Sequence, residues 1–323
     1  IPIFIPELAC PNRCIYCNQR HISGQLQAVK PEEIKQIIEQ HLATFIRPSE
    51  VELAFFGGSF TGIDEKDMLT YLQIVQPYIE QGEIKSIRIS TRPDYINEKI
   101  LDILQQYNVK DIELGAQSLN EEVLAFAKRG HTVRDVENAS QLIKSYGFSL
   151  GLQMMIGLPL ATVEKSKETA KKILKLGAES TRIYPTLVIN NTDLADLYRQ
   201  NKYKALSLDE AVDWTAEIYK IFSQSSIKIL RVGLHPSEAL INGTELLAGP
   251  FHVSFKELVL TKIWQEKFEK LPINTKTILV NPKEINYAIG YNSKNKRLLQ
   301  KKFPYLKFIS DSNVELGTFI AQN

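Results

Sequence analysis

The stretch Val-Glu-Leu-Ala-Phe-Phe-Gly-Gly-Ser-Phe-Thr-Gly, residues 51–62, indicates the architecture of this 323-residue chain. Residues 51–56 form an apolar run that predicts a buried strand, and the paired glycines predict a loop at its carboxyl end. A helical pattern, with apolar residues three and four apart, follows at residues 66–79. A strand, a loop and a helix in this order predict one β/α unit of a parallel sheet.

The same alternation continues on both sides of this unit. Six strand–helix units are too few for a closed eight-fold barrel, so we predict an α/β fold built as a partial parallel (β/α)6 TIM-like barrel. Functional residues should then lie at the carboxyl ends of the strands. The predicted strands are residues 3–5, 51–56, 84–89, 111–114, 150–155 and 181–184, and the predicted helices are 31–45, 66–79, 98–106, 133–146 and 163–176.

Composition excludes several classes of protein. The chain is 44% hydrophobic and 24% charged, as in an ordinary globular protein. No apolar run approaches the roughly 18 residues of a membrane span, and the amino end is too short for a signal sequence. The three cysteines are an odd number within eight positions, which argues against a disulfide framework. We therefore expect a cytoplasmic protein without membrane contact.

Cys10, Cys14 and Cys17 follow the first predicted strand in the sequence Ala-Cys-Pro-Asn-Arg-Cys-Ile-Tyr-Cys-Asn. Three thiolates in one short loop can hold three corners of a 4Fe–4S cluster and leave the fourth iron open to a small molecule. A structural zinc site is an alternative, with His21 as the local candidate for a fourth ligand. Three unrelated buried cysteines are another alternative.

The pattern Cys-x-x-x-Cys-x-aromatic-Cys, in which Tyr16 supplies the aromatic residue, resembles the signature of the radical S-adenosylmethionine (radical SAM) superfamily. The resemblance implies a 4Fe–4S cluster on the three cysteines, which would be both metal ligands and catalytic residues. It also implies S-adenosylmethionine as the second cofactor, cleaved reductively to a 5′-deoxyadenosyl radical.

The resemblance extends to positions that would contact S-adenosylmethionine. Gly58 and Ser59 match the segment that binds the methionine amino group, although Ser59 stands where many members have Glu. Gln117 and Arg129 are twelve residues apart, as in the oxygen-independent coproporphyrinogen III oxidase, and suit ribose hydroxyls and a carboxylate. The expected cofactor contacts are Tyr16, Gly57, Gly58, Ser59, Ser90, Gln117, Arg129, Gln153, Met155 and Tyr184; candidates for acid–base or radical-relay roles, or else packed polar residues, are His131, Tyr184, Tyr203, His235 and His252.

A narrower resemblance, from about residue 3 to about residue 203, is to the radical SAM domain of the Elongator catalytic subunit and its bacterial relatives. Those enzymes carboxymethylate wobble uridine in tRNA. The acetyltransferase domain and the extra zinc-binding cysteines of that family are not found in this sequence, so neither acetyl-CoA as co-substrate nor uridine carboxymethylation itself is expected. The motifs that carry the resemblance are Ser-Thr-Arg-Pro-Asp (90–94), Glu-Leu-Gly-Ala-Gln-Ser (113–118), Lys-Arg-Gly-His-Thr (128–132), Met-Met-Ile-Gly-Leu-Pro (154–159) and Arg-Ile-Tyr-Pro-Thr-Leu-Val (182–188).

The carboxyl-terminal 50 residues contain eight Lys and Arg against three Asp and Glu, whereas the whole chain has a net charge of only +2. A strand, a helix, a tight loop, a helix and a strand are expected there, which resembles a K-homology (KH) RNA-binding core with Ser293 in place of its second loop glycine. A basic solvated helix on a capping unit is the alternative. The expected RNA contacts are Gly290, Lys294, Lys296, Arg297 and Lys301.

These patterns together predict three parts: a radical SAM partial barrel at residues 1–240, a connecting segment at 241–272, and a small α+β KH-like unit at 273–323. The leading hypothesis is an enzyme that modifies RNA, specifically tRNA, and receives electrons from a donor such as flavodoxin or ferredoxin. Two alternatives remain open at this point. One is an enzyme similar to oxygen-independent coproporphyrinogen oxidase, and the other is a non-enzymatic haem or cluster chaperone on the same barrel.

Overall fold

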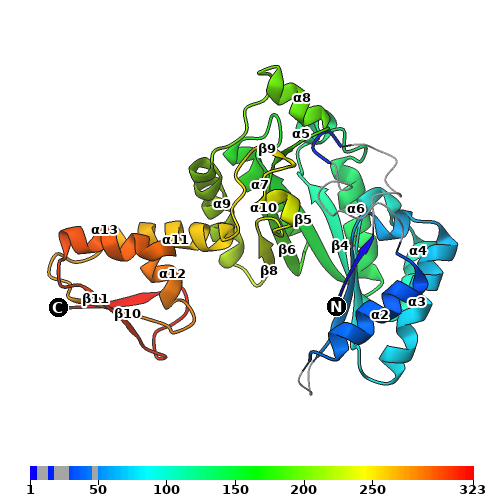
Figure 1. Cartoon of the computed structure of the whole chain (residues 1–323), viewed down its shortest axis with the longest axis horizontal. Coiled ribbons are helices and arrows are strands. Elements are labelled where there is room, and N and C mark those ends of the chain that lie inside the picture. Colours follow the sequence, from blue (N-terminus) through cyan, green and yellow to red (C-terminus); the bar gives the residue numbers. More distant parts are fainter. Residues whose placement is uncertain (6–13, 18–28, 46–49) are drawn as a thin grey trace.

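The computed structural model describes residues 1–5, 14–17, 29–45 and 50–323. Within these ranges, seven strands form one curved sheet in the order β1-β2-β3-β4-β5-β6-β8, and all neighbouring strands are parallel (Figure 1). This is the predicted partial barrel. The strands are β1 (Pro2–Ile5), β2 (Glu52–Gly57), β3 (Ser86–Thr91), β4 (Val109–Gln117), β5 (Ser149–Ile156), β6 (Ser180–Pro185) and β8 (Lys228–Val232).

The sheet has one strand more than the six that the sequence predicted. The additional strand, β8, pairs with β6 at the edge of the sheet. Its five residues begin with an exposed lysine and include a half-buried arginine, and only Val232 is buried. A short edge strand with this composition lacks the apolar run by which the other strands were found.

Helices cover the convex face of the sheet. Two of them begin with capping boxes, at Thr132 with Asp135 and at Ser207 with Glu210, which satisfy free amide groups of the first helical turn. None of the described helices is long and apolar enough to cross a membrane. The helices that follow the strands are α2 (Pro31–Leu42), α3 (Glu65–Glu80), α4 (Glu98–Gln106), α6 (Val133–Ser145), α7 (Val163–Lys175) and α9 (Leu208–Ser223).

Smaller elements surround the carboxyl ends of the strands. They include the short helices α5 (Glu121–Phe126) and α8 (Asp193–Arg199), which lie together at the top of the molecule in Figure 1. The remaining small elements are η2 (Phe60–Gly62), η3 (Pro93–Tyr95), α10 (Glu238–Ile241) and a two-stranded antiparallel ribbon of β7 (Val188–Ile189) and β9 (Leu246–Ala248).

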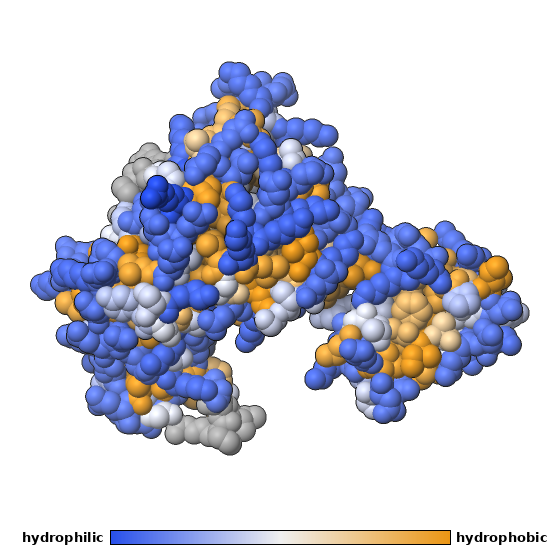
Figure 2. Space-filling view, turned by 180° about the vertical axis from the view of Figure 1, so that it is seen from behind, coloured by the Kyte–Doolittle hydropathy of each residue, from blue (hydrophilic) through white to orange (hydrophobic). Residues whose placement is uncertain are grey.

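Helix α11 (Phe255–Phe268) joins the barrel to the carboxyl-terminal unit. Its first half places Phe255 and Val259 in the hydrophobic core of the barrel, whereas Trp264 and Phe268 belong to a second core. Because one continuous helix contributes to both cores, it is expected to hold the two parts in a fixed orientation. Figures 1 and 2 show the carboxyl-terminal unit as a separate lobe that projects to one side of the barrel.

The carboxyl-terminal unit has the predicted α+β composition. Its central strand pairs in parallel with β11 and antiparallel with β12, which the sequence had not predicted. Figure 2 shows hydrophobic side chains on the surface of this lobe among the hydrophilic ones. The elements are β10 (Thr277–Val280), α12 (Ile285–Ile289), η4 (Tyr291–Ser293), α13 (Lys294–Lys302), β11 (Lys307–Ser310) and β12 (Phe319–Gln322).

Candidate active site

Cys14 and Cys17 lie in one tight turn. The amide of Cys17 donates to the carbonyl oxygen of Cys14 at 3.0 Å. Ile15, which follows Cys14, donates its amide to the carbonyl oxygen of Ala127 at 3.2 Å, and its own carbonyl oxygen accepts from the amide of Leu194 at 2.8 Å. The turn is therefore held between the segment after α5 and the start of α8. Cys10, the third predicted ligand, and His21 lie outside the described residues.

Arg129 is buried beside this turn, with 7% of its surface exposed. Its Nη1 donates to the sulfur of Cys14 at 3.1 Å and its Nη2 donates to the carbonyl oxygen of Gly115 at 2.7 Å. Burial lowers the pKa of Arg129, but the Tyr16 phenol and the Cys14 thiol outweigh burial and raise that pKa above its usual value. A guanidinium held so close to sulfur stabilises negative charge on it. Arg129 is thus part of the site and not a solvated cation at a helix end.

Gln117 ends β4 in an unusual state. Its φ is 63°, which is rare for a residue other than glycine, and its Oε1 is buried with no hydrogen-bond partner among the residues that the structure describes. Backbone strain and an unsatisfied buried acceptor in one residue are typical of a ligand-binding position.

Gly115, which the sequence analysis did not single out, allows Gln117 and Arg129 to lie together over the end of β4. A Cβ at Gly115 would lie 2.9 Å from Nε2 of Gln117 and 3.3 Å from Nη2 of Arg129. A larger residue would therefore displace at least one of the two predicted cofactor contacts. In the sequence, only the position of Gly115 two residues before Gln117 could have suggested that it leaves room for these side chains.

The predicted glycine loop lies at the end of β2. The amide of Gly58 donates to the carbonyl oxygen of Ile5 at 2.7 Å, which places the loop beside the end of β1. Ser59 follows and is buried. Since the cysteine segment follows β1 in the chain, the two predicted cofactor-binding segments begin at neighbouring strand ends.

Four further predicted contacts lie on the neighbouring strands of the sheet. Ser90 is paired in register with Glu113 on the adjacent strand β4. Gln153 donates to Oε2 of Glu113 at 3.1 Å, and Met155 is in register with Tyr184. All four side chains are half-buried. They line the same wall as Glu113.

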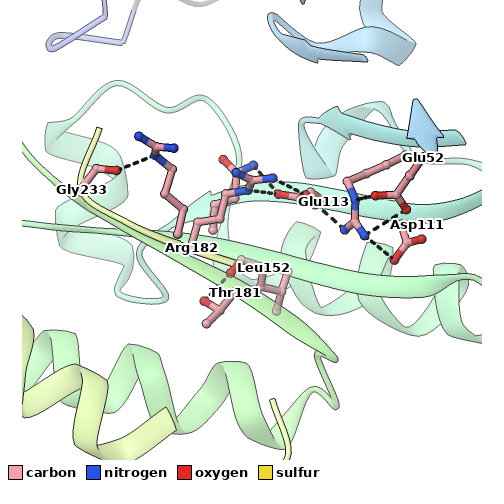
Figure 3. A network of polar contacts seen from close by, with 10 residues as sticks. Glu52, Asp111, Glu113, Leu152, Thr181, Arg182 and Gly233 are labelled. Atoms are coloured by element: carbon pink, nitrogen blue, oxygen red, sulfur yellow. Dashed lines mark hydrogen bonds and ion pairs between the residues drawn. The ribbon is translucent and has the colours of Figure 1, made fainter. Parts of the chain in front are cut away.

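Glu113 is the centre of a charged network on this wall that the sequence analysis missed (Figure 3). Its carboxylate is 1% exposed and accepts from Arg182 through two bonds, Nε to Oε2 at 2.5 Å and Nη2 to Oε1 at 2.9 Å. Arg88 donates to the same carboxylate at 3.3 Å. Burial raises the pKa of Glu113, but Arg182 outweighs it and holds that pKa below its usual range.

Arg88 connects Glu113 to two more carboxylates. It bonds Glu52 at 2.8 Å through Nε and contacts Asp111 at 3.2 Å through Nη2. Burial raises the pKa of Asp111, and the neighbouring Glu52 carboxylate raises it further, against the opposing effect of Arg88. Charged residues at alternate positions of otherwise apolar strands are the sequence signal that could have revealed this network.

The proposed acid–base and relay residues differ in their surroundings. His131 is 3% exposed, and burial together with Arg129 lowers its pKa to about 4, so it is neutral at pH 7. Tyr203 donates to the carbonyl oxygen of Gly157 at 2.7 Å. His235 is exposed, and His252 accepts from the amide of Ser254 and packs edge-on against a tyrosine of the carboxyl-terminal unit.

Comparison with known proteins agrees with this geometry. The family model described as the radical SAM superfamily matches residues 5–173, and the model of the radical SAM C-terminal domain matches residues 178–265. The chain is 31% identical over 185 residues to the tRNA uridine(34) acetyltransferase of Methanocaldococcus jannaschii, covering 51% of this chain and 34% of that protein. It is 37% identical over 146 residues to Elongator complex protein 3 of Saccharomyces cerevisiae, covering 44% of this chain and 26% of that protein.

A solved structure shows the same fold. The archaeal Methanocaldococcus infernus Elp3 with an N-terminal deletion superposes with a TM-score of 0.67 at 21% identity, covering 82% of this chain and 63% of that chain. The chain spans about a third or less of the length of the two curated relatives named above. The superfamily model, by contrast, matches more than half of this chain and includes the cysteine turn, Gln117 and Arg129. The chain belongs to the radical SAM superfamily.

Proposed function

We propose that this chain cleaves S-adenosylmethionine reductively at a 4Fe–4S cluster held by Cys10, Cys14 and Cys17, and uses the resulting radical to modify RNA, with tRNA as the substrate class. The observation that carries the first half is the buried contact of Arg129 with the sulfur of Cys14, next to the unsatisfied amide oxygen of Gln117. A cytoplasmic location and an electron donor such as flavodoxin or ferredoxin belong to the same proposal.

The described residues fit both cofactors. Cys14 and Cys17 place two thiols in one turn, which is the donor type that iron–sulfur clusters require. The buried Oε1 of Gln117 needs a donor, and a ribose hydroxyl supplies one. When bound, the cluster supplies the electron that splits S-adenosylmethionine into methionine and the 5′-deoxyadenosyl radical. The protein then orients the cofactor and excludes water.

Gln117→Ala is expected to weaken S-adenosylmethionine binding about tenfold, because a hydrogen bond at a buried site contributes roughly 1–2 kcal/mol. Equilibrium dialysis with the cluster-loaded protein measures this directly. Gln105→Ala, on the exposed face of α4, is the matched control and should bind as the unmodified protein does. Equal affinities of all three proteins would remove Gln117 from the cofactor site.

The proposal that the substrate is RNA is supported by the names of the relatives and by the carboxyl-terminal unit. Ser293 adopts φ 58°, the left-handed conformation that favours glycine, at the position where the KH loop has its second glycine. The amide of Tyr291 already donates to Oγ1 of Thr261 at 2.8 Å, and that of Ser293 donates to Gly290 at 2.8 Å. Side chains rather than these two amides are therefore expected to contact phosphate.

Five cations lie at and after this loop and are called the basic set: Lys294, Lys296, Arg297, Lys301 and Lys302. Across the described part of the chain, none of them forms an ion pair. A cleft of about 330 Å³ beside the loop is lined by Thr261, Tyr287 and Tyr291 among others. Unpaired cations beside a cleft with aromatic side chains are typical of an RNA-binding surface.

Replacing Lys294, Lys296, Arg297 and Lys301 together with Gln is expected to weaken tRNA binding and to reduce its dependence on salt. Each lost phosphate contact should lower the slope of log K against log salt by about 0.7–0.9. Filter binding of bulk tRNA across a salt series measures both effects. The control replaces four exposed lysines of the barrel with Gln, at the same change in net charge: Lys110, Lys144, Lys171 and Lys175. Equal slopes for the two variants would refute RNA binding by the basic set.

A further inference from the structure

Arg231 lies on the last strand of the sheet, in register with Arg182 on β6. Side chains paired in register on neighbouring parallel strands lie on the same face, so Arg231 faces the concave wall that carries the Glu113 network. Tyr184, two residues after Arg182, lies on this face as well. All three side chains are half-buried, and a ligand inside the partial barrel can therefore reach them.

The arginines on this wall differ in their partners. Arg88 and Arg182 contact the carboxylates of Glu52, Asp111 and Glu113. Arg231 instead donates to carbonyl oxygens, from Nε to Gly233 at 3.0 Å, drawn in Figure 3, and from Nη2 to Leu234 at 3.1 Å. Among the ion pairs of the described residues, none includes Arg231. Its guanidinium is thus fixed in orientation, and no carboxylate in residues 1–5, 14–17, 29–45 and 50–323 neutralises its charge.

Tyr184 adds a second donor next to Arg231. Burial raises the pKa of Tyr184, although Arg182 and Arg231 act in the opposite direction, and the phenol keeps its proton at neutral pH. Arg182, two residues before Tyr184 on β6, acts on the same phenol. Arg231 and Tyr184 therefore both lie at the β6–β8 end of the wall, where the charge of Arg231 acts on the Tyr184 phenol.

Within the sheet, the strands of this end are separated from β1, although the cysteine turn itself reaches the start of α8 through the bond from Leu194 to Ile15. The sheet order puts β6 and β8 at the opposite edge from β1, after which the cysteine segment begins. A substrate group bound by Arg231 on β8 would lie at the edge of the concave surface that carries the expected cofactor contacts on β2 to β6. Such an arrangement places the reacting part of the substrate between its own anchor and the cofactor.

We infer that Arg231 and Tyr184 form an anion site that binds a phosphate group of the substrate. A guanidinium matches the paired oxygens of a phosphate, and it loses little entropy here because the backbone carbonyls already hold it. The assignment of that phosphate to RNA rests on the function proposed above. The anion site itself rests on the charges and contacts of the β6–β8 wall.

The direct test is binding of inorganic phosphate, followed by ³¹P line broadening at low salt. Arg231→Gln is expected to weaken phosphate binding about tenfold, the loss typical of a charge-assisted hydrogen bond, whereas Arg231→Lys should lose less. Arg134→Gln, which removes an exposed arginine from α6, is the matched control and should bind as the unmodified protein. Acetate tested in parallel should compete weakly. Phosphate binding by Arg231→Gln within twofold of the unmodified protein would overturn the inference, provided that circular dichroism shows both proteins folded.

A second measurement separates this inference from the proposed function. Arg231→Gln should raise by about tenfold the tRNA concentration that gives half-maximal 5′-deoxyadenosine formation, and Arg134→Gln should leave it unchanged. If tRNA has no effect on the unmodified protein but phosphate binding depends on Arg231, the anion site stands and the RNA proposal fails. If tRNA stimulates both variants alike, RNA chemistry stands and the assignment of Arg231 to the RNA phosphate fails.

Discussion

Cys17→Ala is expected to lose the visible absorption of the iron–sulfur cluster and to reduce 5′-deoxyadenosine formation by more than about 100-fold. Removing a residue that only supports a metal ligand typically costs 10–100-fold, and removing a ligand itself should cost more. Cys17 is the more informative cysteine of the described pair, because Cys14 also accepts the hydrogen bond from Arg129. Iron and sulfide content, measured with activity after anaerobic reconstitution, checks the prediction.

Ser310→Ala is a suitable control for this substitution, since it trims an exposed residue of β11 far along the chain from the cysteine turn. It should retain full iron content. A Cys17→Ala protein with the iron content of the control would show that Cys17 is no ligand. Tightly bound zinc in the unmodified protein, with no iron after reconstitution, would favour the structural zinc site instead.

Glu113→Ala should lower the free energy of unfolding by about 3 kcal/mol or more, because it leaves the guanidiniums of Arg88 and Arg182 without their shared buried partner. Urea unfolding followed by circular dichroism gives the value. Asp213→Ala breaks the pair with Lys262 between α9 and α11, in which Asp213 is 58% exposed, and should cost less than about 1 kcal/mol. Similar losses in the two variants would mean that the Glu113 network does not stabilise the barrel.

The lowered pKa of Glu113 also predicts how the stability of the protein depends on pH. The pKa of Glu113 is lower in the folded protein than its usual value of 4.5, so the unfolded chain binds its proton at higher pH than the folded chain does. The stability that this carboxylate contributes is therefore complete above about pH 4.5 and is lost as the pH falls through the folded pKa. The difference in unfolding free energy between the unmodified protein and Glu113→Ala should shrink over that range. A difference that stays constant on acidification would contradict the charge assignment.

The fold was predictable from sequence where periodicity was strong. Apolar runs of the inner strands and the three- and four-residue spacing of the helices gave the β/α order, and this order was confirmed. Strands β8 and β12 were missed because each is short and has exposed residues along it. Helix α11 belongs to two cores, a role that no local pattern in its sequence can reveal.

The candidate site was predictable only in part, because sequence spacing identifies residues and not the contacts between them. The cysteine spacing and the positions of Gln117 and Arg129 gave the radical SAM assignment, which is confirmed at the level of the superfamily. The hydrogen bond from Arg129 to Cys14 joins residues 115 positions apart and needed the structure. The Glu113 network and Arg231 likewise depend on the register of neighbouring strands.

The most direct test of the account is 5′-deoxyadenosine formation by the anaerobically reconstituted protein with S-adenosylmethionine and dithionite, measured with and without bulk tRNA. The account predicts formation in both samples and a clear increase with tRNA. No formation by a protein that carries an intact cluster would contradict the radical chemistry. Formation that is identical with and without tRNA would contradict RNA as the substrate.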